Sequence, residues 1–387
     1  MSETVSRIAI VNRGEAAARC LRAIRELRIE EPQAGLVGIA LFTDPDRLAP
    51  FVREADESLS LGPAFQVSPD GSLRSAYLDY DRLVEALRRV RADAVWPGWG
   101  FVAEHPEFAE RLEREGITFL GPSGATMRRL GDKIMSKHIA AAAGVPVSRW
   151  SGGPVTREDV ERWAHDVGFP VVLKATAGGG GRGIRVVETA ADLFGAFDSA
   201  SGEALAAFGN GTLFVEARIS AARHVEVQMA ADKHGTVLAL GVRDCSVQRK
   251  HQKVIEESPP PGLSAAFLDR IRESSIRLLR EVGYVGVATC EYLVTAANEF
   301  FFLEVNPRLQ VEHGVTELLT GLDIVKAQIR IARGERLPDV APAERGAAME
   351  VRLCAEDPAA GFAPSPGYIA LLDLPAGPGI RVDSGIA

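Results

Sequence analysis

A run of glycines is the strongest chemical signal in the sequence. Residues 174–183 read Lys-Ala-Thr-Ala-Gly-Gly-Gly-Gly-Arg-Gly, with strand-like residues on both sides. Glycines expose backbone N–H groups with no side chains in the way, which suits close approach to phosphate oxygens. The run is not a Walker A loop, because no Lys-Ser/Thr pair follows Gly183 and a strand follows where a helix would be needed. We predict a flexible phosphate cover flanked by Lys174 and Arg182, with a plain linker as the alternative.

Two glutamates are expected to face each other in a hairpin. The strand-like runs Val287–Val294 and Phe300–Val305 flank a polar turn. If Ala297 and Asn298 form a two-residue turn, the register places Glu291 opposite Glu304. Like charges directly opposite each other destabilise a sheet unless a cation lies between them.

The face that carries this glutamate pair has the oxygen donors of a metal site. Asn306 falls on the same face as Glu304 by the period of two, while the apolar Leu293 is expected opposite Phe302. Two carboxylates and an amide oxygen suit Mg²⁺ that bridges nucleotide phosphates. We predict a metal site at Glu291, Glu304 and Asn306. A solvent-facing edge with harmless glutamates is the alternative.

Polar residues continue at every second position after the hairpin. They are Asn306, Arg308, Gln310 and Glu312. Pro307 must end regular strand pairing or lie at an edge. An arginine beside a carboxylate that could act as a base suits binding and deprotonation of a small anion. An ordinary salt-bridged strand has the same pattern, and the residues alone leave both interpretations open.

Two further polar clusters have simple structural explanations. Residues 224–229 predict an amphipathic strand, with Val225, Val227 and Met229 toward the core and His224, Glu226 and Gln228 outward. Residues 248–253 carry three cations, which predicts either a solvated loop or a local positive field for an anion.

Composition excludes several classes of protein. The chain has 387 residues, 44 Lys+Arg and 52 Asp+Glu, hence a formal charge of −8, which argues against a nucleic-acid platform. No run reaches the roughly 18 apolar residues of a membrane span, and the polar start is not a signal peptide. Four widely spaced cysteines form no CxxC pair, so we expect reduced, mostly buried thiols in a cytoplasmic protein.

The elements that must position these residues indicate an α/β and α+β fold. Residues 1–125 alternate strand-like and helical runs, which predicts a parallel sheet with crossover helices. The first turn, Asn12–Glu15, has one glycine and no GxGxxG, so a dinucleotide site is not expected. One helix is expected from Met127 to about Val147, and a capping box at residues 156–159 starts the next. Residues 126–335 form a distinct α+β domain, and 336–387 are too short for a core of their own.

At this point the motifs resemble biotin carboxylase, the ATP-grasp component of biotin-dependent carboxylases. The matching stretches follow the family order: 10–15, 97–100, 131–133, 174–183, 243–246, 249–253, 304–313 and 355–358. The resemblance implies a Rossmann-like N-terminal domain over 1–125, an ATP-grasp domain over 126–335 and a partial C-terminal domain over 336–387. It implies that ATP, bicarbonate and biotin react through carboxyphosphate to carboxybiotin, with Mg²⁺ or Mn²⁺.

The resemblance also implies a role for individual residues. Implied nucleotide contacts are Lys133, Lys174, Gly179, Gly180, Gly181, Arg182, Gly183, Glu216, His224, Gln248 and His251. Implied metal ligands are Glu291, Glu304 and Asn306. The implied bicarbonate pocket is Lys253, Arg308, Gln310 and Val311. Glu312 resembles the general base, and Arg352 resembles the residue that stabilises the biotin enolate, a fixed guanidinium where negative charge develops.

Several departures from the family pattern define the expected partners. The Ala-Met-Lys-Met biotinylation motif is missing, so biotin is expected on a separate carrier domain, next to a carboxyltransferase and within a possible homodimer. Trp96 and Trp99 replace a His and a Tyr, as in carboxylases fused into one polypeptide, and Gly314 replaces a Pro. Family members continue past Arg381–Gly385, which predicts a fragment of a larger acyl-CoA carboxylase. A carbamoyl-phosphate synthetase-like ligase and a non-catalytic ATP-binding fragment are the alternatives.

Overall fold

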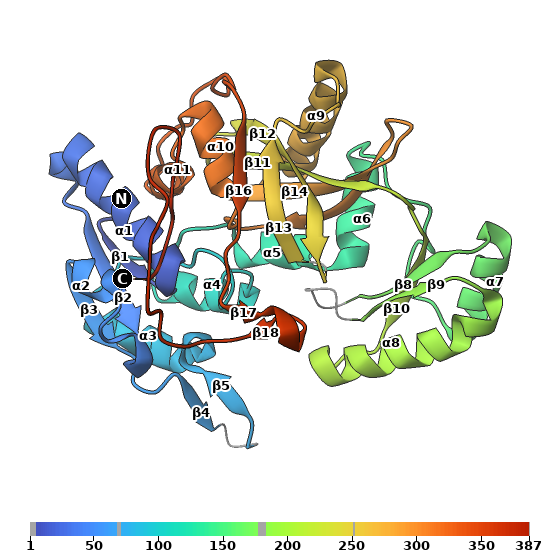
Figure 1. Ribbon diagram of the computed structural model, residues 1–387, viewed down its shortest axis with the longest axis horizontal. Coiled ribbons are helices and arrows are strands. Elements are labelled where there is room, and N and C mark those ends of the chain that lie inside the picture. Colours follow the sequence, from blue (N-terminus) through green and yellow to red (C-terminus); the bar gives the residue numbers. More distant parts are fainter. Residues whose placement is uncertain (1–4, 68–70, 177–182, 251, 387) are drawn as a thin grey trace.

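A five-stranded parallel sheet forms the N-terminal layer of the computed structural model (Figure 1), which describes residues 5–67, 71–176, 183–250 and 252–386. Its strand order is β3-β2-β1-β6-β7. The strands are β1 (Arg7–Ile10), β2 (Val37–Phe42), β3 (Glu57–Ser60), β6 (Ala94–Trp96) and β7 (Thr118–Phe119). The associated helices are α1 (Gly14–Glu30), α2 (Pro50–Glu54), α3 (Tyr80–Arg89) and α4 (Pro106–Arg114). The predicted strand–helix alternation and parallel pairing are confirmed.

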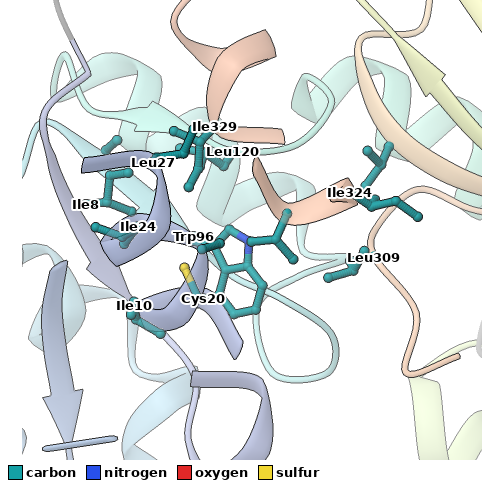
Figure 2. Close-up of a cluster of buried hydrophobic side chains, with 14 of the residues drawn as sticks. Ile8, Ile10, Cys20, Ile24, Leu27, Trp96, Leu120, Leu309, Ile324 and Ile329 are labelled. Carbon is teal, nitrogen blue, oxygen red and sulfur yellow. The ribbon is translucent and has the colours of Figure 1, made fainter. Parts of the chain in front are cut away.

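Trp96 connects this layer to the rest of the molecule. Its side chain is fully buried, and its indole N–H donates to Gln328 at 3.1 Å. Figure 2 shows Trp96 between the α1 side chains Cys20 and Ile24 and the distant Ile324 and Leu309. Leu309 lies within the polar segment singled out above, so one buried leucine fixes that segment to the core.

Two helices replace the single helix expected from Met127 to Val147. They are α5 (Gly124–Gly131) and α6 (Lys133–Ala142). Asp132 separates them, because its side chain accepts a hydrogen bond from the Met135 backbone N–H and so starts a new helix. The break places Lys133 at the first position of α6.

A small three-stranded antiparallel sheet lies apart from the larger sheets, at the right of Figure 1. It contains β8 (Val171–Ala175), β9 (Ile184–Val187) and β10 (Leu213–Ala217). Helices α7 (Arg157–Val167) and α8 (Leu193–Phe208) pack on it. The predicted capping box at Thr156 and Asp159 is confirmed, whereas α8 was not predicted.

A six-stranded antiparallel sheet carries most of the polar residues of interest. Its order is β15-β14-β11-β12-β13-β16. The strands are β11 (Arg223–Ala231), β12 (Val237–Arg249), β13 (Gln252–Ser258), β14 (Gly286–Val294), β15 (Phe300–Asn306) and β16 (Ala348–Val351). The neighbouring helices are α9 (Ala265–Glu281), α10 (His313–Thr320) and α11 (Ile324–Ala332). Gln248 and Arg249 therefore end β12, and Gln252 and Lys253 begin β13, which pairs with it.

The last described residues form little regular structure. Two short strands, β17 (Glu356–Asp357) and β18 (Ala363–Pro364), pair with each other, as do β4 (Phe65–Val67) and β5 (Leu73–Ser75) in the N-terminal part. All four cysteines are free and three of them are buried, as expected. Among the described residues, no helix is both long and apolar enough to cross a membrane.

Candidate active site

The β14–β15 hairpin places two glutamates face to face. Glu291 pairs with Glu304, as predicted, but the assumed two-residue turn is wrong. The loop has three residues between Thr295 and Glu299, and it ends at Asn298 in a left-handed conformation with φ +57°. A bulge beyond Glu291 then restores the register of the glutamate pair.

The bulge also changes the neighbouring pairs. Leu293 faces Phe301, not Phe302 as predicted, because the register shifts by one residue between Glu291 and Tyr292. Asn306 follows on β15, and its amide donates to Glu291 at 2.8 Å. The bulge therefore separates an apolar half of the hairpin from a polar half.

Glu291 is the most heavily bonded carboxylate of the site. Its Oε1 accepts hydrogen bonds from Lys253, Asn306 and Gln310 at 2.8–3.0 Å. Its Oε2 lies 2.9 Å from Nε2 of His224. Burial alone would raise the pKa of Glu291, but the Lys253 ammonium and His224 hold it well below its usual range.

Lys253 lies at the centre of three carboxylates. Its Nζ is 2.5 Å from Glu226, 2.9 Å from Glu291 and 2.8 Å from Glu312. Within the described part of the chain, two close groups of side chains have metal-ligand chemistry, and they share these carboxylates: His224–Glu226–Glu291 and Glu226–Cys245–Glu312. Because the lysine already supplies the positive charge, we interpret neither group as a metal centre.

The pair formed by Glu291 and Glu304 fits a divalent cation better. Among the described residues, the side chain of Glu304 has no hydrogen-bond or ion-pair partner, although the residue lies opposite Glu291 on the paired strand. Burial first, and the Glu291 charge second, raise the pKa of Glu304. An unpaired carboxylate beside a like charge and an amide oxygen is the donor set that hard cations bind.

The segment after β15 reaches the site as a loop, not as a continuing strand. Pro307 ends the pairing at Asn306, as expected, so the step of two between the polar residues is lost. Gln310 and Glu312 are nevertheless buried, because Leu309 is anchored in the core. Arg308 lies nearby and donates to Asn306 Oδ1 at 3.2 Å, and the half-buried Val311 follows Gln310.

Arg352 holds the far side of Glu312. Its Nη2 donates to Glu312 Oε2 at 2.8 Å, while Glu312 Oε1 receives Lys253. Glu256 binds the same guanidinium at 2.6–2.7 Å. Glu312 therefore has one oxygen on a lysine and the other on an arginine, and its side chain is 2% exposed.

Three lysines gather around Glu216. Lys174 on β8 pairs with Glu216 Oε1, and Lys137 on α6 lies 2.7 Å from Oε2. Lys133 lies one turn before Lys137 on α6 and interacts electrostatically with Glu304 and Glu216. Sequence reasoning missed Lys137, although its spacing of four from Lys133 placed both on one helix face.

The outer face of β11 is buried, contrary to the prediction. Glu226 and Gln228 were expected to face outward, yet both are fully buried on the site face of the sheet. Arg243, another residue that was missed, lies fully buried opposite them and bonds Glu226 at 2.7 Å and Gln228 at 2.9 Å. His224 is half-buried, and Gln248 Nε2 is 3.0 Å from its Nδ1.

Part of the predicted nucleotide site lies outside the described residues. This applies to Gly179, Gly180, Gly181, Arg182 and His251. Gly183 is described with φ +69°, and a side chain there would collide with the methyl group of Ala175. A cavity of about 370 Å³ in the N-terminal layer, lined by Tyr80 and His105 among others, includes none of the candidate residues.

Family models match three stretches of the chain. The model described as "Biotin carboxylase, N-terminal domain" matches residues 4–127. The model described as "Carbamoyl-phosphate synthase L chain, ATP binding domain" matches 132–340. The model described as "Biotin carboxylase C-terminal domain" matches 350–387.

Curated relatives match along the whole chain. The biotin-dependent acyl-coenzyme A carboxylase alpha3 subunit of Mycobacterium leprae is 41% identical over 100% of this chain and 62% of its own length. A pyruvate carboxylase subunit of Methanothermobacter thermautotrophicus is also 41% identical, over 98% of this chain and 75% of the relative. Pyruvate carboxylase of Aspergillus terreus is 41% identical over 98% of this chain, which spans only 31% of that relative.

Solved structures have the same fold. The Campylobacter jejuni biotin carboxylase complex with β,γ-ATP has a TM-score of 0.92 at 40% identity, covering 99% of this chain and 83% of that one. The biotin carboxylase domain dimer of Hydrogenobacter thermophilus 2-oxoglutarate carboxylase, in complex with MgADP, ADP and bicarbonate, has a TM-score of 0.90 at 40% identity. It covers 98% of this chain and 82% of that one.

Proposed function

The chain belongs to the biotin carboxylase family, and on this premise we propose that it uses ATP and bicarbonate to carboxylate biotin. In this reaction bicarbonate attacks the γ-phosphate of ATP to give ADP and carboxyphosphate. Biotin then takes the carboxyl group and phosphate leaves. The observation that carries the proposal is the position of Glu312, buried between Lys253 and Arg352.

The bicarbonate step requires a base inside a positive pocket. Glu312 is the proposed base, because its two oxygens face two cations that can hold an anion beside it. Arg308 and Gln310 lie on the same anchored loop and are proposed anion contacts, together with the Val311 backbone. Arg352 is placed to stabilise negative charge that develops on the biotin ureido group.

The nucleotide is proposed to lie between the small sheet and the six-stranded sheet. Lys133 and Lys174 would bind its phosphates under the glycine run, and Glu216, His224, Gln248 and His251 would contact the nucleoside. Glu291, Glu304 and Asn306 would hold Mg²⁺ or Mn²⁺, which neutralises phosphate charge when it is bound. The H. thermophilus complex contains MgADP and bicarbonate, which supports these ligands for this chain.

A turnover assay tests the reaction and its base together. We expect ATP hydrolysis in the presence of Mg²⁺ to depend on bicarbonate and to rise with free biotin. Glu312→Gln should lower the bicarbonate-dependent rate about 100-fold or more, because a positioned general base contributes at least that factor. Production of ADP, followed with and without each substrate, gives the measurement.

The matched control is Glu299→Gln, which removes an exposed carboxylate from the turn of the same hairpin. Its rate should equal that of the unchanged chain. If ATP hydrolysis depends on bicarbonate but its rate does not change when biotin is added, the result would favour a carbamoyl-phosphate synthetase-like ligase. Nucleotide binding without turnover would favour a non-catalytic ATP-binding chain.

The acceptor that finally receives the carboxyl group is a separate proposal. We propose an acyl-CoA carboxylase role, supported by the M. leprae relative, although a pyruvate carboxylase role has equally similar relatives. The carrier domain with its biotin, the carboxyltransferase and the cytoplasmic location are likewise proposed. A homodimer is proposed from the H. thermophilus domain dimer.

A further inference from the structure

Lys137 has no role in the reaction proposed above, yet it is one of the buried charges of the site. Its side chain is 4% exposed, on a helix face that points at the nucleotide region. Nζ lies 2.7 Å from Glu216 Oε2 and donates to the Ser148 hydroxyl at 2.9 Å. Ser148 in turn donates to the same Glu216 oxygen at 2.9 Å, which closes a buried triangle.

Glu216 therefore binds two lysines at once. Its other oxygen, Oε1, is paired with Lys174. Burial by itself would raise the pKa of Glu216, but Lys174 and Lys137 hold it at about 2. One carboxylate and two ammonium groups leave this buried cluster with one surplus positive charge.

The two lysines differ in their freedom to move. Lys137 is held by Ser148, by Glu216 and by the indole face of Trp150, whose centroid is 5.7 Å from Nζ. Lys174 is more exposed, at 12% of its side chain, and its strand leads directly into the glycine run. If a phosphate arrives, Lys174 is the lysine that can leave Glu216.

The free-energy cost of moving Lys174 away depends on whether Glu216 keeps another cation as a partner. A buried carboxylate with a single lysine forms a neutral pair, and opposite charges at contact attract strongly in a medium of low dielectric. Separating that pair would leave an uncompensated buried charge. With Lys137 in place, Glu216 stays neutralised after Lys174 has left.

We propose that Lys137 is a positioning residue that neutralises Glu216 and so frees Lys174 to bind the phosphates of a nucleoside di- or triphosphate. This inference rests on the proposed function, because it takes Lys174 as a phosphate ligand. Lys137 itself touches no phosphate. Its contribution appears only for ligands that draw Lys174 away from Glu216.

Calorimetric binding of Mg²⁺-ADP and of adenosine tests the proposal. Adenosine occupies the nucleoside part of the site but has no phosphate for Lys174. Lys137→Met should weaken ADP binding about tenfold, which corresponds to ~1.4 kcal/mol, and leave adenosine binding unchanged. Lys137→Arg, which keeps the charge, should restore ADP affinity to near that of the unchanged chain.

A second pair of variants isolates the route through Glu216. In a Glu216→Gln background nothing holds Lys174, so adding Lys137→Met should not change the ratio of ADP to adenosine affinity. Equal weakening of ADP and adenosine by Lys137→Met would overturn the proposal in favour of a purely structural role. Unchanged ADP affinity would overturn it as well. If the unchanged chain binds neither ligand, the proposed function fails together with it.

Discussion

Glu350 is a titratable group that the proposed reaction does not use. It lies directly opposite Glu256 in the β13–β16 pair. Burial first, and the Glu256 charge second, raise the pKa of Glu350 from 4.5 to about 8. The folded chain therefore keeps a proton here that the unfolded chain releases above about pH 4.5, so this group lowers stability as the pH rises from 4.5 to 8.

The variant Glu350→Gln should remove this loss. At pH 5 its melting temperature should match that of the unchanged chain, and at pH 8.5 it should be higher, because glutamine carries no charge to bury. Thermal unfolding at both pH values gives the measurement. The exposed Glu281 at the end of α9 provides the control, since Glu281→Gln should shift the two melting temperatures alike. A Glu350→Gln effect of the same size at both pH values would contradict this assignment.

Site residues were predictable where side chains of suitable chemistry lie close together in sequence at a spacing that places them on one face. The pairing of Glu291 with Glu304 was predicted from the hairpin, although the assumed turn is one residue too short and the bulge beyond Glu291 compensates for it. Lys137 was missed because its partner Glu216 is 79 positions further along by their numbering, and Arg243 was missed because its partner Glu226 lies on the neighbouring strand. A single cation forms no recognisable sequence motif, because its partners come close to it only in the folded chain.

At the level of elements, the turn of the β14–β15 hairpin controls the register. Asn298 adopts φ +57°, a conformation that asparagine and glycine tolerate better than other residues. We expect Asn298→Ala to destabilise the chain by about 1 kcal/mol, because alanine keeps the Cβ that is strained there and lacks the short polar side chain by which asparagine tolerates this conformation. Asn298→Gly should stay within a few tenths of a kcal/mol of the unchanged chain.

Urea unfolding of the two variants measures the difference. Both lose the same side-chain amide, so the comparison isolates the backbone conformation. Equal destabilisation by alanine and glycine would mean that the asparagine side chain, and not the left-handed backbone, stabilises the turn.

Helices and strands were predicted where the sequence shows a capping motif or a regular hydrophobic repeat, and they were missed where it shows neither. The capping box at Thr156 identified its helix. The α8 helix was missed because glycines and serines within residues 193–208 lower its helix propensity. β13 was missed because it begins within the cationic stretch 248–253, which resembles a solvated loop, although the strand carries Lys253 into the site.

Over the whole molecule, the N-terminal layer and the segment after β15 share one core and one charge network. Trp96 joins the two in the core (Figure 2). Arg19 on α1 joins them in the network, since its Nη2 is 2.9 Å from Glu317 and 2.7 Å from Asp323. Arg381, near the end of the chain, binds the same Glu317 at 2.6 Å. Parts far apart in sequence should therefore unfold together, which no local pattern could predict.

Arg19→Met tests this coupling. Arg19 is 3% exposed, so its removal leaves the buried Glu317 with one cation fewer and Asp323 without this ion-pair partner. We expect a loss of about 3 kcal/mol in the free energy of unfolding, within a single transition. The matched control is Arg25→Met on the same helix, whose partner Glu54 is half exposed, and which should cost less than about 1 kcal/mol. Denaturant unfolding followed by both fluorescence and circular dichroism measures the two variants. Equal losses, or separate transitions for the two probes, would mean that the N-terminal layer is not coupled to the site through this network.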